Sequence, residues 1–136
     1  MTGEGILDTS TVVLLGRLRP ERLPDVPLIT AVTLAELSVG PLVARSRKER
    51  SSRQAVLQHA EADFEPLPFD AEAARAFGRV AASLRAAGRK VEARGYDAMI
   101  AATAIANEVP LYTVNPADFS GIDDLDLRPV DHPDQS

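Results

Sequence analysis

A stretch rich in alanine and isoleucine, 96–122, constrains the fold of this chain more than any other part of it. It reads YDAMIAATAIANEVPLYTVNPADFSGI. Its pattern predicts a helix, then a short apolar strand at 111–113, then a turn that contains Asn115, Pro116 and Asp118. A helix that leads directly into a buried strand is typical of an α/β fold.

The same alternation of strand and helix runs through the rest of the chain. We expect strands that end near residue 7, begin at 28, and span 64–69, 111–113 and about 125–130. We expect helices over 8–18, from 32 to an interruption at Gly40 and Pro41, and over 45–63, 70–87 and 96–107. The proline-rich segment 20–27 is expected to lack regular structure. This order predicts a mostly parallel sheet covered by helices on both faces, with functional residues at the carboxyl ends of the strands.

The chain is expected to form one domain over 1–136, with a frayed tail at 132–136. Its residues are 45% hydrophobic but only 4% aromatic, so Ala, Leu, Val and Ile must fill the core. No apolar run approaches the roughly 20 residues of a membrane helix. The first five residues also lack the basic start of a signal peptide. We therefore expect a cytoplasmic protein with no membrane partner.

The formal net charge of −5 argues against binding nucleic acid through phosphate neutralisation alone. Two basic clusters run against this balance, and each is typical either of a solvated helix face or of a local contact with nucleic acid. The clusters are Arg45, Arg47, Lys48, Arg50 and Arg53, and then Arg85, Arg89, Lys90 and Arg94.

Four acids stand alone in segments that otherwise avoid charge: Asp8, Glu36, Asp97 and Asp118. Three of them have ordinary structural explanations. Asp8 can cap the first helix, Asp97 can cap its helix or favour the positive end of that helix, and Asp118 can form a turn after Pro116. These explanations remain open from the sequence.

Glu36 resists such an explanation because it lies inside a helix, on a face shared with Val32, Val39 and Val43. An ionised carboxylate that is buried without a partner carries a large desolvation cost. The neighbouring sequence offers no cation, and four converging acids would repel one another and raise their pKa values. A divalent cation would remove both problems.

The available ligands narrow the choice of cation. The chain has no cysteine and only two isolated histidines, His59 and His132, so zinc sites built on thiolates are excluded. An acidic site made of oxygen ligands suits Mg²⁺ or Mn²⁺. Mg²⁺ typically bridges carboxylates to phosphates, which indicates phosphodiester chemistry.

The segments ILDTS, TLAEL and YDAMIAATAIANEVPLYTVNPADF, with their spacing, resemble the PIN-domain ribonucleases, and more closely the VapC toxins of type II toxin-antitoxin pairs. The resemblance covers roughly residues 6–129. It implies a three-layer α/β/α sandwich on a mostly parallel sheet of four or five strands. It also implies Mg²⁺-dependent endonucleolytic cleavage of RNA, with Mn²⁺ as a substitute. The partners implied are RNA, a cognate antitoxin and a second copy of the chain.

The resemblance also assigns roles to single residues. It makes Asp8, Glu36, Asp97 and Asp118 the acidic quartet of the active site. Asp8 and Asp97 are then the principal Mg²⁺ ligands, with Glu36 and Asp118 bound directly or through water. Three residues would orient the acids, namely Thr9, Thr113 and Asn115. The sequence TVNP lacks a basic residue often found there in the family, and Arg94 is an alternative substrate contact or an ordinary solvated side chain.

Other classes of protein fit the sequence less well. A phosphoacceptor receiver domain needs a lysine after its last strand, and none follows Lys90. A haloacid-dehalogenase-type phosphatase needs an aspartate two residues after the first, where this chain has Ser10. A catalytically inactive PIN domain that only binds a partner also remains open.

Overall fold

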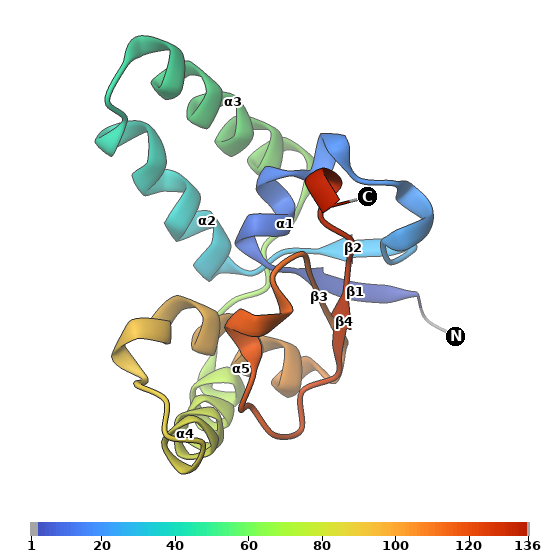
Figure 1. Cartoon of the computed structure of the whole chain (residues 1–136), viewed down its shortest axis with the longest axis vertical. Coiled ribbons are helices and arrows are strands. Elements are labelled where there is room, and N and C mark those ends of the chain that lie inside the picture. Colours follow the sequence, from blue (N-terminus) through green and yellow to red (C-terminus); the bar gives the residue numbers. More distant parts are fainter. Residues whose placement is uncertain (1–2, 136) are drawn as a thin grey trace.

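Four parallel strands form one sheet at the centre of the computed structural model, which describes residues 3–135 (Figure 1). The strands are β1 (Glu4–Leu7), β2 (Val26–Leu28), β3 (Leu111–Thr113) and β4 (Leu127–Pro129). Their order is β2-β1-β3-β4, and all three pairings are parallel. The predicted parallel sheet and the predicted edge strand near the carboxyl end are thus confirmed.

Five α-helices cover both faces of this sheet. They are α1 (Thr9–Val13), α2 (Ala31–Val39), α3 (Arg47–Asp63), α4 (Ala71–Ala86) and α5 (Gly95–Asn107). Successive residues of a strand point to opposite faces. Leu7 therefore packs in one cluster with residues of α1 and α3, and Ile6 in another with residues of α5, behind which α4 lies (Figure 1). The predicted three-layer α/β/α arrangement is confirmed.

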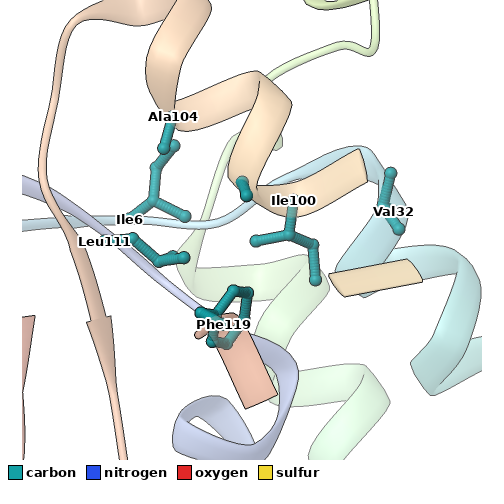
Figure 2. Packing of buried hydrophobic residues seen from close by; sticks show 7 residues of the cluster. Ile6, Val32, Ile100, Ala104, Leu111 and Phe119 are labelled. Carbon is teal, nitrogen blue, oxygen red and sulfur yellow. The ribbon is translucent and has the colours of Figure 1, made fainter. Parts of the chain in front are cut away.

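The core on the Ile6 face fixes the position of α5. Ile6 and Leu111 from the sheet pack against Ile100 and Ala104 of α5, with Phe119 beside them (Figure 2). These side chains are 0–2% exposed. Burying an isoleucine, leucine or phenylalanine stabilises the fold by about 1.5–3 kcal/mol each. This packing holds the first turn of α5 near the carboxyl edge of the sheet, where Asp97 lies.

Several helices begin at a residue whose side chain caps the free amides. Asp8, Thr30, Ser46 and Asp70 each accept a hydrogen bond from the backbone N–H three residues later. A cap of this kind contributes about 1 kcal/mol. The predicted cap at Asp8 is therefore present, and it places this carboxylate at the end of β1.

The first helix is shorter than predicted. Helix α1 ends at Val13 instead of residue 18 and is followed by a 3-10 turn at Leu15–Arg17. Four of its five residues, Thr9, Thr11, Val12 and Val13, are β-branched and have a modest preference for helix. The cap at Asp8 and the burial of Val12 support only this short segment.

The proline-rich segment 20–27 is not wholly irregular, which corrects the prediction. It holds a 3-10 turn at Pro20–Arg22 and the start of β2 at Val26. Pro27 is tolerated because β2 is an edge strand, where a missing N–H leaves no partner unpaired.

The strand predicted over 64–69 is absent, apart from one bridge between Leu67 and Thr30. Pro66 and Pro68 lack amides, so Leu67 alone exchanges hydrogen bonds with the neighbouring segment, at 2.9 Å to the Ile29 carbonyl and 2.8 Å from the Ala31 amide. An isolated pair of bonds does not extend into a strand.

The tail predicted to fray, 132–136, contains one 3-10 turn in the part that the structure describes, and its fraying stays a prediction. Residues Pro133–Gln135 form a 3-10 turn, and Asp134 pairs with Arg17 near the end of α1. Ser136, like Met1 and Thr2, lies outside the described residues. Across residues 3–135 no helix has the length and apolar character required to cross a membrane.

Candidate active site

The four isolated acids come from four different segments that meet at the carboxyl edge of the sheet. Asp8 follows β1, Glu36 lies in α2, Asp97 lies in the first turn of α5, and Asp118 lies in a 3-10 turn, Pro116–Phe119, after β3. The charges of the other three all act on Asp97. The structure therefore brings together the four acids that the sequence singled out.

Asp8 is the most buried of these acids, with 3% of its surface exposed. Its Oδ2 accepts from the hydroxyls of Thr113 at 2.9 Å and Ser10 at 3.0 Å. Its Oδ1 accepts from the Thr11 amide at 3.2 Å and from the Thr11 hydroxyl. Burial raises the pKa of the Asp8 carboxyl above its usual value, and these hydrogen bonds act in the opposite direction. The donors hold the carboxylate in one orientation.

Two of these hydroxyls, from Thr11 and Thr113, both donate to Asp8 and accept from a backbone amide. The Thr11 hydroxyl accepts from the Val114 amide at 3.1 Å, and the Thr113 hydroxyl accepts from the Asn115 amide at 2.9 Å. An ionised carboxylate can only accept a hydrogen bond, so the proton of each of these hydroxyls points to Asp8 while the hydroxyl oxygen accepts from the backbone N–H. The backbone after β3 thus orients Asp8 through two threonines.

Glu36 is half-buried and is held by a hydroxyl. Thr9 Oγ1 donates to Glu36 Oε1 at 2.6 Å and lies 3.0 Å from Thr33 Oγ1. Within residues 3–135, Glu36 has no cationic partner. Burial raises the pKa of Glu36, the charge of Asp8 adds to this increase, and the bond from Thr9 lowers it.

The apolar face predicted around Glu36 is buried only in part. Val32 is 7% exposed, whereas Val39 and Val43 are 47% and 61% exposed. Leu42 and Val13 are also exposed, at 81% and 51%. Glu36 therefore stands at the border between the core and an exposed apolar surface, defined here as Val13, Val39, Leu42 and Val43.

Asp97 has the most strongly shifted pKa of the acids. Burial, and then the charges of Asp118, Asp8 and Glu36, raise the pKa of Asp97 to about 6, while the Arg94 guanidinium lowers it. The side chain does not cap α5, because the N-cap position is Arg94 and no side chain bonds there. The explanation of Asp97 as a helix cap is therefore wrong, whereas its place in the first turn of α5 agrees with the alternative that its charge favours the positive end of the helix.

Asp118 forms an ion pair with Arg94. The Arg94 Nη1 donates to Asp118 Oδ1 at 2.9 Å and to its carbonyl oxygen at 3.4 Å. The expectation that no cation lies among the acids is wrong. Arg94 is 28% exposed and is not a freely solvated side chain. Its proposed contact with substrate stays a prediction.

The three residues predicted to orient the acids differ in how they act. Thr9 and Thr113 bond to Glu36 and Asp8 directly, whereas the exposed Asn115 acts through its backbone, with its N–H donating to Thr113 and its carbonyl accepting from the Asp118 amide. The sequence did not single out the contacts of Ser10 and Thr11 with Asp8. The run of three hydroxyl residues immediately after Asp8 was the available signal.

The donor set fits a hard divalent cation. In residues 3–135 no three acidic or histidine side chains are already arranged as a closed metal cage. Mg²⁺ does not need such a cage, because it keeps several waters and is usually held by one or two carboxylates. Carboxylate oxygens that raise one another's pKa values attract a cation. Asp8 and Asp97 can therefore hold the ion together with water.

A cavity of about 350 Å³ opens beside these acids. Its lining comes from α2, from the 3-10 turn Glu92–Arg94 and from the start of α5. The lining residues are Glu36, Glu92, Ala93, Arg94, Gly95, Tyr96, Asp97 and Met99. The cavity gives a substrate access to Glu36 and Asp97.

The protein has a parallel sheet between helical layers and isolated acids at the carboxyl edge of that sheet. Comparison of its sequence with known protein families identifies the class of protein that has these features. Residues 6–125 match the PIN domain family model, and the chain belongs to the PIN domain family.

Within that class, the chain belongs to the VapC family. It is 42% identical over 122 residues to Ribonuclease VapC5 of Mycobacterium tuberculosis, a match that covers 88% of this chain and 87% of that protein. It is 27% identical over 129 residues to Ribonuclease VapC of Rickettsia bellii, covering 92% and 95% of the two chains.

Solved structures agree with these sequence matches. The crystal structure of VapBC-5, a member of the VapBC family of toxin-antitoxin systems from Mycobacterium tuberculosis, is similar with a TM-score of 0.78 and 36% identity. That match covers 94% of this chain and 98% of the other. DNA-bound VapBC from Salmonella typhimurium matches with a TM-score of 0.71 and 25% identity over 91% and 96% of the two chains.

Proposed function

We propose that this chain is a metal-dependent endoribonuclease and the toxin of a toxin-antitoxin pair. The observation that carries the proposal is the convergence of four acids at the carboxyl edge of the sheet, beside a cavity that Glu36 and Asp97 line. The 42% identity to a ribonuclease of the VapC family supports the choice of RNA as substrate. The site of action is the cytoplasm, where RNA is present.

Asp8, Glu36, Asp97 and Asp118 form the active site in this proposal. Asp8 and Asp97 hold the cation, and Glu36 and Asp118 reach it directly or through water. Mg²⁺ is the expected ion and Mn²⁺ its substitute, since both prefer oxygen ligands. A bound divalent cation supplies charge stabilisation to the phosphate and lowers the pKa of a water molecule.

The protein's own side chains orient the carboxylates and provide a group that accepts a proton. Threonine hydroxyls fix Asp8 and Glu36, so the carboxylates are oriented before substrate arrives. Glu36 Oε1 accepts from Thr9, which leaves Oε2 available to orient the attacking water or to accept its proton. The raised pKa of Glu36 favours proton acceptance closer to neutral pH than an ordinary glutamate allows.

A cognate antitoxin is the proposed protein partner, because VapBC-5, which this chain resembles, is a toxin-antitoxin system. The exposed apolar side chains of Val13, Val39, Leu42 and Val43 are available to a partner protein, and Val13 lines a cavity together with Glu36. The uncompensated acids of the cavity favour a basic segment in that partner. A homodimer remains a further proposal.

The proposal is tested by incubating the purified chain with structured and single-stranded RNA in the presence of Mg²⁺, Mn²⁺ or EDTA. We expect cleavage with either cation and none with EDTA. Asp8→Asn removes a charge from the site, whereas Asp70→Asn changes a cap of the same geometry at the start of α4. Loss of cleavage in Asp8→Asn, with cleavage retained in Asp70→Asn, supports the proposal. No cleavage by the unaltered chain with any cation would assign it instead to the inactive PIN domains.

A further inference from the structure

Tyr96 is the aromatic side chain that the packing of the protein explains least. It is 51% exposed, although it directly precedes Asp97. In the described part of the chain, its ring has no aromatic or cationic neighbour and its hydroxyl has no hydrogen-bond partner. By contrast, Tyr112 lies beneath Arg128, and Phe69 meets Phe77 with 6.4 Å between ring centroids. The ring of Tyr96 is therefore free to bind a ligand.

The position of Tyr96 does not contribute to the hydrophobic core. The core residues of α5 are Ala98, Ile100, Ala101, Ala102 and Ala104. Tyrosine also has a weaker preference for helix than alanine or leucine. Neither core packing nor helix propensity thus explains an exposed ring at the start of α5.

The lining of the cavity beside the acids holds both charged and apolar side chains. Glu36, Glu92 and Asp97 supply carboxylates, Arg94 supplies a cation, and Ala93, Tyr96 and Met99 supply the apolar part, called here the apolar wall. A nucleotide has the same division, with a charged phosphate and a flat, weakly polar base. With the phosphate at the carboxylates and their cation, the neighbouring base faces the apolar wall.

Electrostatic attraction by side chains is weak at this place, so another source of affinity is needed. The cation nearest to the acids, Arg94, is already paired with Asp118, and the chain carries a net charge of −5. Stacking of a base on an aromatic ring does not depend on charge and is available to every base. It requires a base that is not paired within a duplex.

We propose that Tyr96 forms a nucleobase subsite, in which an unpaired base next to the scissile phosphate stacks on its ring. This inference rests on the proposed ribonuclease function. It predicts that the chain selects single-stranded or looped RNA at the point of cleavage. Met99 and Ala93 complete the apolar wall on which the base lies.

The test measures cleavage of a single-stranded oligoribonucleotide by the unaltered chain and by the variants Tyr96→Phe and Tyr96→Leu. Tyr96→Phe keeps the ring and Tyr96→Leu removes it. Phe69→Leu is the matched control, because it removes a partly exposed ring, 36% exposed, from the segment before α4. The same oligonucleotide is also made with a single abasic nucleotide, placed in turn at each position around the cleavage site.

We expect Tyr96→Leu to raise KM about tenfold, the order of effect of one base–aromatic stack, with little change in kcat. Tyr96→Phe and Phe69→Leu should leave KM unchanged. With the abasic nucleotide at one particular position, the KM of the unaltered chain should rise by the same factor, and the KM of Tyr96→Leu should rise no further. This lack of additivity shows that ring and base interact with each other.

Equal KM values for the unaltered chain and Tyr96→Leu would overturn the subsite while leaving the ribonuclease function intact. Additive losses from Tyr96→Leu and every abasic position would also overturn it. If Tyr96→Leu instead weakens only the binding of a co-expressed antitoxin, the ring belongs to a protein interface and the subsite is wrong. Failure of the unaltered chain to cleave any RNA would count against the proposed function and the subsite together.

Discussion

Arg94 and Asp118 form an ion pair with 2.9 Å between the guanidinium and the carboxylate, and this pair places a cation within the acidic site. The same guanidinium lowers the pKa of Asp97, against the combined effect of burial and three neighbouring carboxylates. The site is therefore partly neutralised by its own chain before any metal ion binds. Arg94 and an incoming divalent cation compete for the same negative charge.

Replacement of Arg94 should strengthen metal binding. Arg94→Met removes the competing charge and frees Asp118, so we expect tighter binding of Mn²⁺ at pH 8 by calorimetry. The free energy of unfolding without metal should fall by at most about 1 kcal/mol, since a partly exposed ion pair contributes little. Arg75→Met, which breaks the exposed pair with Glu72 on α4, serves as the control. An unchanged affinity in Arg94→Met would show that the arginine does not oppose the metal.

Asp97→Asn should stabilise the metal-free protein at neutral pH. The pKa of Asp97 rises from 3.8 to about 6 in the folded state, so the folded chain binds more protons than the unfolded chain between these values. Stability therefore falls as pH rises through this window, and it stays reduced above pH 6. Asparagine removes the charge, and we expect a gain of about 1 kcal/mol at pH 7, allowing for solvent screening of this half-exposed group. Urea denaturation of both proteins at pH 5 and pH 7 measures this gain, and a lower stability of Asp97→Asn than of the unaltered chain at pH 7 would contradict the expectation.

Metal binding and cleavage should depend on pH with a midpoint near that of Asp97. A cation binds the ionised carboxylate, so its affinity decreases as pH falls below about 6. We expect calorimetric titration with Mn²⁺ at pH 5.5 to show weaker binding and proton release, and at pH 7.5 tighter binding with less release. Asp97→Asn should lose most of this proton release. The same release in both proteins would show that another group titrates.

Thr9→Val should weaken metal binding through Glu36. The hydroxyl of Thr9 donates to Glu36 at 2.6 Å and lowers the pKa of that acid, so its removal raises the pKa and frees the carboxylate to rotate. Thr9→Ser keeps the hydroxyl and should behave like the unaltered chain. We expect Glu36→Gln to reduce Mn²⁺ affinity at least as much as Thr9→Val. If Thr9→Val binds Mn²⁺ like the unaltered chain, Thr9 does not orient Glu36.

The sequence predicted the layers of the fold because the pattern of apolar residues carries most of the information needed. The helices at 70–87 and 96–107 and the strand at 111–113 all depend on residues close in the chain. The failures have equally local causes. The two prolines in 64–69 remove amides that a strand needs, and the prolines in 20–27 concealed β2, because an edge strand tolerates them.

The candidate site was predictable in its acids but not in its contacts. An isolated carboxylate in an apolar segment is visible in the sequence, as Glu36 shows. The pairing of Arg94 with Asp118 was not visible, because the two residues lie 24 positions apart and meet only through tertiary packing. The cation of the site thus comes from a segment distant from Asp118 in sequence, while Glu36 has no cationic partner within residues 3–135.

The hydrogen bond from Thr113 to Asp8 also bears on when this protein becomes active during its synthesis. It joins residues 105 positions apart, and β1 lies between β2 and β3 in the sheet. Contacts this distant in sequence form late in folding, since a long loop must close first. A nascent chain that ends before Leu111 lacks β3, the Thr113 hydroxyl and Asp118. Nuclease activity is thus expected only after residues 111–118 have left the ribosome, and chains terminated before Leu111 should be harmless to RNA.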